Sequence, residues 1–458
     1  MTAAAPNVPP APLVVGFITL GCPKNLIDSE RMLANLALEG FVVTGEVEAA
    51  DVAVVNTCAF IDEARQESGQ AIAELVEQKR RGRLELVIVA GCYPQLDREA
   101  ILEEWPDVDA VVGLAAREDI GKIIRRLARR RSDRPLEAVP PFTHQVADDR
   151  ARLRLTPRHY AYLRITEGCN NRCSYCTIPR IRGLLRSKPL PRILSEATEL
   201  VADGAKELIV IGQDTTAYGQ DLKGRVGICD VLARLAEMRG LRWLRLLYTH
   251  PASFPERLIK SYGELEKLLP YVDLPLQHIS QPILDSMGRR TTRAGVEQLI
   301  DGLRRARPGM ALRTSLIVGY PGETDGQFAE LLDFVRQARF DRLGAFAYSA
   351  ESGTRAAALP GHVPPEVKQE RLRALMMLQQ EISAARHAEL VGRRAEAIID
   401  QGSDSPEAPA LGRLWSQAPD IDGATAVHGG APLQAGEIIE VEISAAGPYD
   451  LEATVPTR

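Results

Sequence analysis

Short apolar runs rich in β-branched residues alternate with segments of helical spacing through most of this 458-residue chain. Strands that alternate with helices predict parallel sheets, because each helix returns the chain to the same end of the sheet. Four such runs before about residue 145 predict an α/β domain with a doubly wound parallel sheet. They occupy residues 13–20, 52–55, 86–90 and 110–112.

Six further runs follow between residues 155 and 390, again separated by helical patterns. Six β/α units predict an open (β/α)6 partial barrel whose chemistry lies at the C-terminal ends of the strands. From residue 391 to 458, short β-rich runs punctuated by Gly and Pro predict a small OB-like β-barrel. The six runs that predict the partial barrel cover residues 162–165, 208–211, 244–248, 272–275, 312–318 and 343–348.

Composition favours a soluble protein of about three domains, with 45% hydrophobic and 26% charged residues. The first 12 residues are Ala- and Pro-rich and predict a disordered leader rather than a signal peptide. We therefore expect a cytoplasmic location. Seven cysteines, an odd number, make a disulfide framework improbable and leave thiols free to bind metal.

Three cysteines follow predicted strands of the first domain. Cys22, Cys58 and Cys92 are 36 and 34 residues apart, about one βαβ repeat each. Because the carboxyl ends of parallel strands share one edge of a sheet, we expect these thiols to converge there. Simple burial of small apolar side chains is the alternative.

Cys169, Cys173 and Cys176 form a C-x3-C-x2-C pattern directly after the first strand of the partial barrel. Thiolates are the soft ligands that iron–sulfur clusters need, and three of them leave one iron of a four-iron cluster open. A zinc knuckle or structural thiols are the alternatives, but the loop holds no fourth Cys or His. Cys229 matches neither pattern and is expected to serve packing.

This pattern, with the aromatic Tyr175 before the last cysteine, resembles the signature of the radical S-adenosylmethionine superfamily. The resemblance implies a [4Fe–4S] cluster whose open iron chelates S-adenosylmethionine and whose electron cleaves it to a 5′-deoxyadenosyl radical.

Other segments resemble the cofactor motifs of that superfamily. Gly212, Gln213 and Asp214 occupy the place of its Gly-Gly-Glu motif, with Gln and Asp as departures. Gln277 ends the fourth strand and faces the same mouth. The end of the fifth strand resembles the adenine-side motif, and the resemblance implies cofactor contacts from Ser315, Gly319, Gly322 and Glu323.

The whole chain resembles methylthiotransferases: a cluster domain (1–145), a radical barrel (155–390) and a TRAM barrel (391–458). In that family the trio matched by Cys22, Cys58 and Cys92 holds a second [4Fe–4S] cluster, which carries the sulfur to be inserted. Asn25 and Asn56 match the flanking pattern and are expected to orient the loop. The resemblance implies that one S-adenosylmethionine methylates this sulfur and that a second supplies the radical. A flavodoxin or ferredoxin would then supply electrons.

The charge of the C-terminal barrel indicates which of the two substrate classes of this family, transfer RNA or a ribosomal protein, the chain acts on. Residues 393–458 contain four basic and eleven acidic residues, so this barrel should repel phosphate and attract a basic protein. The runs 22–25 and 417–423 also resemble the ribosomal-protein class, which implies modification of an aspartate β-carbon in small-subunit ribosomal protein number twelve. Adenosine in transfer RNA is the alternative substrate, and a scaffold with purely structural clusters is a further one. The Arg-rich linker 131–158 is expected to present a solvated face, and a grip on an RNA-rich partner is the alternative.

Overall fold

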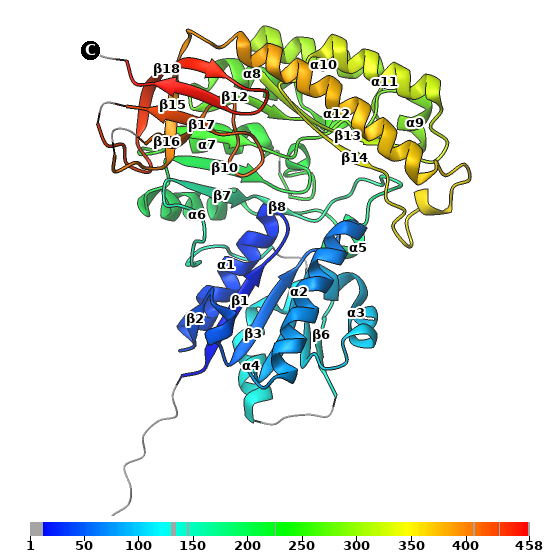
Figure 1. Cartoon of the computed structure of the whole chain (residues 1–458), viewed down its shortest axis with the longest axis vertical. Helices are drawn as coiled ribbons and strands as arrows, with labels where there is room; N and C mark the ends of the chain where they lie inside the picture. Colours follow the sequence, from blue (N-terminus) through cyan, green and yellow to red (C-terminus); the bar gives the residue numbers. More distant parts are fainter. Residues whose placement is uncertain are drawn as a thin grey trace, which may run out of the picture. The chain divides into compact units, whose positions relative to one another are not determined.

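The computed structural model describes residues 12–129, 134–143, 146–224, 226–405, 408–429 and 431–456 (Figure 1). Apart from Pro12, the expected leader lies outside these residues. The chain forms two compact units. Met1–Leu155 and Ile178–Gly183 make the first, and Thr156–Thr177 and Leu184–Arg458 make the second. The strand pattern did not predict that a short later segment joins the first unit.

A six-stranded parallel sheet forms the first unit, in the order β2-β1-β3-β4-β5-β6. Helices α1 and α4 cover one face and α2 and α3 the other, each over its own apolar core. The doubly wound sheet and its four predicted strands are confirmed, and the short edge strands β2 and β6 are additional. The elements are β1 (Val14–Thr19), α1 (Pro23–Leu38), β2 (Val42–Thr44), β3 (Val52–Thr57), α2 (Asp62–Arg80), β4 (Leu86–Gly91), α3 (Cys92–Glu104), β5 (Ala110–Gly113), α4 (Ile120–Arg129), β6 (Leu136–Ala138) and α5 (Ile178–Arg182).

The expected linker 131–158 is divided between the two units: its described residues up to Leu155 belong to the first unit, and residues 156–158 belong to the second. The Arg152 side chain is only 3% exposed, and its Nε lies 3.1 Å from Oε2 of the buried Glu30. The backbone N–H of Leu155 donates to the same carboxylate at 2.8 Å. The expectation of a solvated arginine face is therefore wrong at Arg152, because this side chain forms an ion pair with a buried carboxylate of α1.

Six parallel strands in the order β14-β13-β12-β11-β10-β7 form the open partial barrel of the second unit, as predicted. The main apolar core lies between these strands and their helices and includes Cys229, whose packing role is thus confirmed. The elements are β7 (Tyr160–Arg164), β8 (Thr166–Glu167), β9 (Arg186–Ser187), α6 (Leu190–Ala202), β10 (Glu207–Ile211), α7 (Ile228–Ala236), β11 (Trp243–Leu246), α8 (Glu256–Glu264), β12 (Leu268–Asp273), α9 (Gln281–Ser286), α10 (Arg293–Ala306), β13 (Ala311–Val318), α11 (Asp325–Ala338), β14 (Arg342–Ala347) and α12 (Pro365–Ala388).

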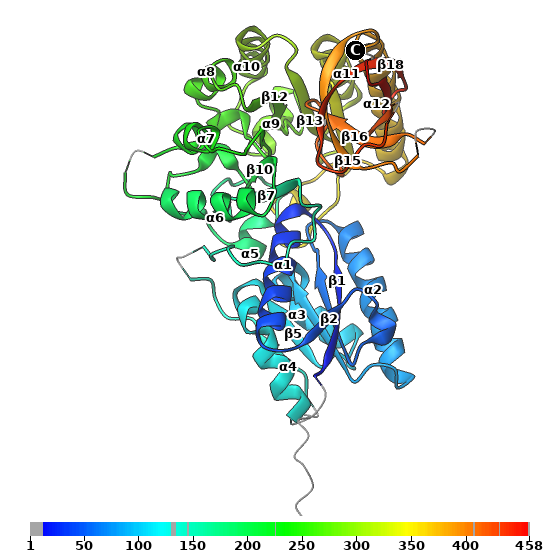
Figure 2. The same ribbon diagram turned by 90° about the vertical axis from the view of Figure 1, so that its left-hand side faces the viewer.

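A closed five-stranded barrel, also predicted, completes the second unit beside α12 (Figure 2). Ser383 of α12 donates from Oγ to the carbonyl of Pro448 at 2.7 Å. Arg413 of this barrel pairs with Glu207 of β10 at 2.8 Å, so charged side chains also join the two barrels. The strands are β15 (Arg394–Gln401), β16 (Ala410–Leu414), β17 (Thr425–His428), β18 (Ile438–Ala446) and β19 (Leu451–Thr454).

Within the described residues, no helix is both long and apolar enough to cross a bilayer.

Candidate functional site

Cys22, Cys58 and Cys92 follow three adjacent strands, β1, β3 and β4, at one edge of the first sheet. A Cβ built at Gly21 would lie 3.1 Å from the Sγ of Cys58, so the turn before Cys22 packs directly against that thiol. The thiols also influence one another electrostatically, since Cys22 and Cys58 both raise the pKa of Cys92. The three cysteines thus share the sheet edge as predicted.

Two buried asparagines tie the loops of this edge together. Nδ2 of Asn25 donates to the carbonyls of Leu20 (2.7 Å) and Thr57 (3.0 Å), which joins the ends of β1 and β3. Nδ2 of Asn56 donates to the carbonyl of Asn25 at 2.9 Å. Their expected role in orienting the loops is confirmed. Gly91 has φ +101°, and a Cβ there would lie 2.2 Å from Oδ1 of Asn56, so this turn requires glycine.

Positively charged side chains counteract the effect of burial on the pKa values of these thiols. Burial raises the pKa of Cys92 to about 12, and Arg182 acts in the opposite direction. Burial has the same effect at Cys22, but Lys24 and Arg182 outweigh it and lower the pKa of that thiol. A buried thiol ionises only where a cation or a metal stabilises the thiolate, and this edge of the sheet provides cations.

In the second unit, the loop that carries Cys169, Cys173 and Cys176 is fixed through Ser174. Its N–H donates to the carbonyl of Met287 and its carbonyl accepts from the N–H of Ala356, both at 2.9 Å. Its Oγ hydrogen-bonds to the Tyr320 hydroxyl at 2.7 Å. Three separate loops therefore hold the backbone between the second and third cysteines.

Arg289 lies beside this loop and was not predicted. It is 5% exposed, and Nη1 lies 4.0 Å from Sγ of Cys173. It also lowers the pKa of Tyr175, which burial raises. A Gly-Arg-Arg sequence after a short helix is too common to have indicated this role.

The motif after β10 connects the barrel to the cysteine loop. Oδ2 of Asp214 accepts from Nδ2 of Asn171 at 2.7 Å, and its Oδ1 accepts from the N–H of Ala217 at 3.1 Å. A Cβ at Gly212 would lie 2.2 Å from the hydroxyl of Thr166, so only glycine fits. Among the described residues, the buried Oε1 of Gln213 has no hydrogen-bond partner, which leaves an acceptor available to a ligand.

The loop after β13 is closed by Glu323. Its carboxylate accepts from the N–H groups of Gly319 and Tyr320 and is fully buried. Gly319 and Gly322 have φ +71° and +83°, as a tight glycine turn requires. The structure thus places Glu323 inside its own loop, where it shapes the backbone.

Gln277, which follows the end of β12, lies beside Ser315 within β13. The N–H of Gln277 donates to the carbonyl of Ser315 at 2.8 Å, although Gln277 itself has φ +72°. The cofactor contacts expected of the motif residues stay predictions, but all of their loops border the open mouth of the partial barrel.

A cavity of about 360 Å³ opens at the same end of the second unit. Ser253 in its wall donates to Asp214 at 3.4 Å, so the cavity borders the motif after β10. Burial, helped by Arg289 and Arg290, lowers the pKa of His250 to about 3, so this ring is neutral near pH 7. The lining residues are Asn171, Gln220, His250, Ala252, Ser253 and Arg290.

Among the described residues, no three Cys, His, Asp or Glu side chains are already arranged as ligands of one metal ion. The donor sets of both loops are nevertheless thiols, which suit iron–sulfur clusters far better than metals that prefer oxygen. The glycine turn at Gly21 brings backbone close to the thiol of Cys58. Both loops therefore fit clusters chemically, and the ligand assignments stay predictions.

Comparison with known proteins agrees with this architecture. The radical SAM superfamily matches residues 163–335, the TRAM domain 391–455, and the uncharacterized protein family UPF0004 14–113. The radical S-adenosylmethionine methyltransferase TsrM from Kitasatospora setae shares the fold, with a TM-score of 0.58, 16% identity, and coverage of 82% of this chain and 90% of that one. The match to the radical SAM superfamily makes this protein a radical S-adenosylmethionine enzyme, a class that uses a [4Fe–4S] cluster and S-adenosylmethionine.

Full-length relatives narrow the class. The ribosomal protein uS12 methylthiotransferase RimO of Geotalea uraniireducens is 44% identical over 95% of this chain and 97% of its own length. RimO of an Anaeromyxobacter species is 43% identical over 96% of this chain and 92% of its own. The chain belongs to the RimO family of methylthiotransferases.

Proposed function

We propose that this chain adds a methylthio group to the β-carbon of an aspartate in ribosomal protein uS12. The observation that supports this most directly is the similarity to RimO proteins over nearly the full length of both chains. The two thiol sets at the carboxyl ends of two parallel sheets supply the chemical means. The acidic C-terminal barrel is consistent with a basic protein as substrate.

Cys169, Cys173 and Cys176 would hold the cluster that binds S-adenosylmethionine. When bound, the cluster and S-adenosylmethionine together supply one-electron chemistry that can break an unactivated C–H bond. Such a carbon is not acidic enough for a side-chain base to remove its proton. The chain's own residues keep the loop in place through Ser174 and surround it with the motifs after β10 and β13. Among the described residues, Oε1 of Gln213 has no hydrogen-bond partner and would be an acceptor for the cofactor's amino group.

The cavity beside this loop suits the target aspartate. Arg290 in its wall can pair with a carboxylate, and Asn171 can donate to it. Because His250 stays neutral, its ring can accept or donate a hydrogen bond without adding charge. These residues would fix the orientation of the side chain that is modified.

Cys22, Cys58 and Cys92 would hold a second [4Fe–4S] cluster, which supplies sulfur. The flavodoxin or ferredoxin expected from the resemblance would provide electrons, and the substrate would be met free or within the small subunit.

Mass spectrometry tests the proposal. The enzyme, reconstituted with iron and sulfide, would receive S-adenosylmethionine, reductant and either small ribosomal subunits or undermodified transfer RNA. We expect a methylthio group on a uS12 aspartate, its loss in Cys169→Ala, and its retention in Cys229→Ala, a buried thiol outside both loops. Modification of adenosine instead would assign the chain the nucleic-acid substrate, and modification by Cys169→Ala would refute the mechanism.

A further inference from the structure

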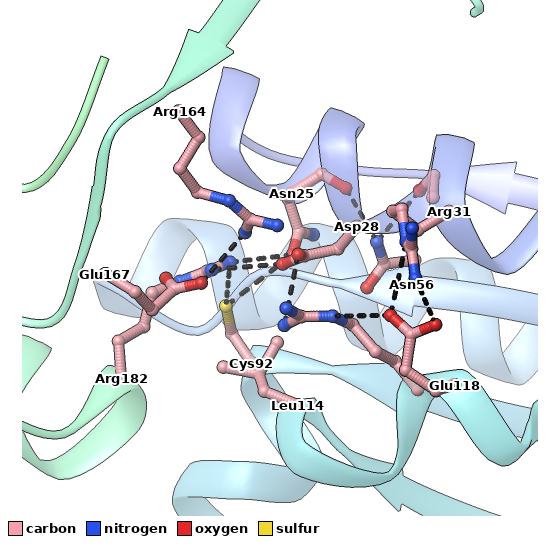
Figure 3. Close-up of polar contacts among 12 residues, drawn as sticks. Asn25, Asp28, Arg31, Asn56, Cys92, Leu114, Glu118, Arg164, Glu167 and Arg182 are labelled. Carbon is pink, nitrogen blue, oxygen red and sulfur yellow. Dashed lines mark hydrogen bonds and ion pairs between the residues drawn. The ribbon is translucent and has the colours of Figure 1, made fainter. Parts of the chain in front are cut away.

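Arg182 is buried against a cysteine of the N-terminal trio (Figure 3). It ends α5, the short helix that belongs to the first unit although it follows the C-x3-C-x2-C loop in sequence. Its side chain is 2% exposed. Nη2 lies 3.4 Å from Sγ of Cys92 and 3.2 Å from Oδ1 of Asn25.

The direction of this guanidinium is fixed by its other partners. Nη1 of Arg182 lies 3.0 Å from Oδ2 of Asp28, which is fully buried. The opposite oxygen of Asp28 pairs with Nη1 of Arg117 at 3.2 Å. Asn25 and Asp28 are three residues apart on α1 and so share one face of that helix. Asp28 and Asn25 thus hold the Arg182 fork against the sulfur of Cys92.

The buried guanidinium of Arg182 meets the sulfur of Cys92 away from water (Figure 3). A cysteine that ligates a metal is a thiolate, so a cluster held by Cys92 would place negative charge on a sulfur that lies 3.4 Å from Nη2 of Arg182. Because both groups are buried, water screens this pair little, and the guanidinium favours added negative charge at the sulfur.

We propose that Arg182 is a positioning residue that sets the reduction potential of the cluster held by Cys22, Cys58 and Cys92. This inference rests on the proposed function, because it presumes that this trio binds a cluster. One-electron reduction adds negative charge and moves no proton to the protein. A buried cation that hydrogen-bonds a ligand sulfur stabilises the reduced form, so its removal makes reduction harder.

The test uses full-length protein in which Cys169, Cys173 and Cys176 are all alanine, so that the N-terminal trio holds the one cluster measured. Iron content is determined first, and the cluster is then titrated with dithionite and followed by electron paramagnetic resonance. Arg182→Gln removes the charge, Arg182→Lys keeps it, and Arg117→Gln is the matched control, because it disturbs the same carboxylate from the other side.

We expect Arg182→Gln to lower the ratio of reduced to oxidised cluster about tenfold at the parent's midpoint, equivalent to ~59 mV for a one-electron couple. Arg182→Lys and Arg117→Gln should each change that ratio by less than about threefold, since both leave a cation beside Cys92. A loaded Arg182→Gln variant with the parent's potential would overturn the inference.

Failure to load iron has distinct meanings. A parent protein without iron refutes the proposed ligand trio itself, before any arginine variant is made, and the inference falls with it. If Arg182→Gln alone lacks iron while Arg182→Lys loads and titrates normally, positive charge is required for the cluster to bind, and the inference that Arg182 sets its potential is overturned. Loss of iron in both variants would assign Arg182 to folding and overturn it.

Discussion

Replacing Glu207 with Gln should loosen the C-terminal barrel from the partial barrel. Glu207 is fully buried at the start of β10, with Oε1 2.7 Å from Nε of Arg245 and Oε2 2.8 Å from Nη1 of Arg413. In the variant, Arg413 would keep its ion pair with Asp400 (2.7 Å). Arg245 would keep its hydrogen bond to the carbonyl of Trp415, but among the described residues it would have lost its carboxylate partner. Removing one member of a buried ion pair costs about 3–5 kcal/mol, and the fully buried Arg245 places Glu207→Gln within that range.

Hydrogen exchange measures this cost in the right place. A loss of about 3 kcal/mol lowers protection of amides in β15–β19 roughly a hundredfold, since 1.4 kcal/mol is a factor of ten. Amides of β3 and β4 belong to the other unit and serve as internal reference. Replacing Glu207, Arg245 and Arg413 together with apolar side chains should restore most of the protection, because no unpaired charge then stays buried. A decrease below about fivefold in Glu207→Gln would refute the reasoning.

The same carboxylate predicts a dependence on pH. Burial would raise the pKa of Glu207, but Arg413 and Arg245 outweigh it and hold the pKa below its ordinary value. Its stabilisation is therefore complete above the ordinary glutamate pKa and is lost as the pH falls through the lower, folded value. The contribution of Glu207 to hydrogen-exchange protection in β15–β19 should therefore be constant from pH 7 to about 5. It should decrease in stronger acid.

Three further perturbations test separate features. Cys58→Ala should lower reconstituted iron from about eight to about four atoms per chain, whereas Cys229→Ala should keep about eight, measured by iron analysis; equal iron in both would contradict the N-terminal ligand set. Gly91→Ala should destabilise the first unit by more than ~1 kcal/mol in urea unfolding, because the new Cβ would meet Asn56 at a positive φ; an unchanged midpoint would show that the turn adapts. Burial lowers the pKa of His387, so the second unit should lose stability as the pH falls below about 6.5, and His387→Gln should flatten that profile in thermal unfolding; a parallel profile in the variant would exclude His387 as the cause.

Most strands of the two parallel sheets were predictable because each is a short apolar run, and strands such as β3, β4 and β10 are buried along their whole length. The edge strands β2 and β6 escaped because three residues give no periodic pattern. The common sheet edge of Cys22, Cys58 and Cys92 was predictable from parallel topology alone, since only one edge carries the carboxyl ends of the strands.

Contacts between segments distant in sequence were not predictable. Nothing in the five residues of α5 indicates that Arg182 lies against Cys92, because an arginine in a basic segment usually faces solvent. The same holds for Arg152, whose partner Glu30 is more than a hundred residues away. Side-chain pairing over such separations depends on the tertiary structure and leaves no local period.

The charge count of the C-terminal barrel illustrates how far composition alone can be used. It favoured a protein substrate, in agreement with the relatives, but three of the acidic residues counted are occupied inside the second unit. Asp400 pairs with Arg413 and His159, Asp422 accepts from Tyr271 at 2.7 Å, and Asp420 accepts from Tyr160 at 3.4 Å. The side chains of Asp400 and Asp422 are 23% and 2% exposed and are largely shielded from a partner, whereas Asp420 stays exposed. Attraction of a basic protein must therefore come from carboxylates that stay on the surface, such as Glu440, Asp450 and Glu452. A count from the sequence overstates the negative field of this barrel, because it cannot separate shielded carboxylates from exposed ones.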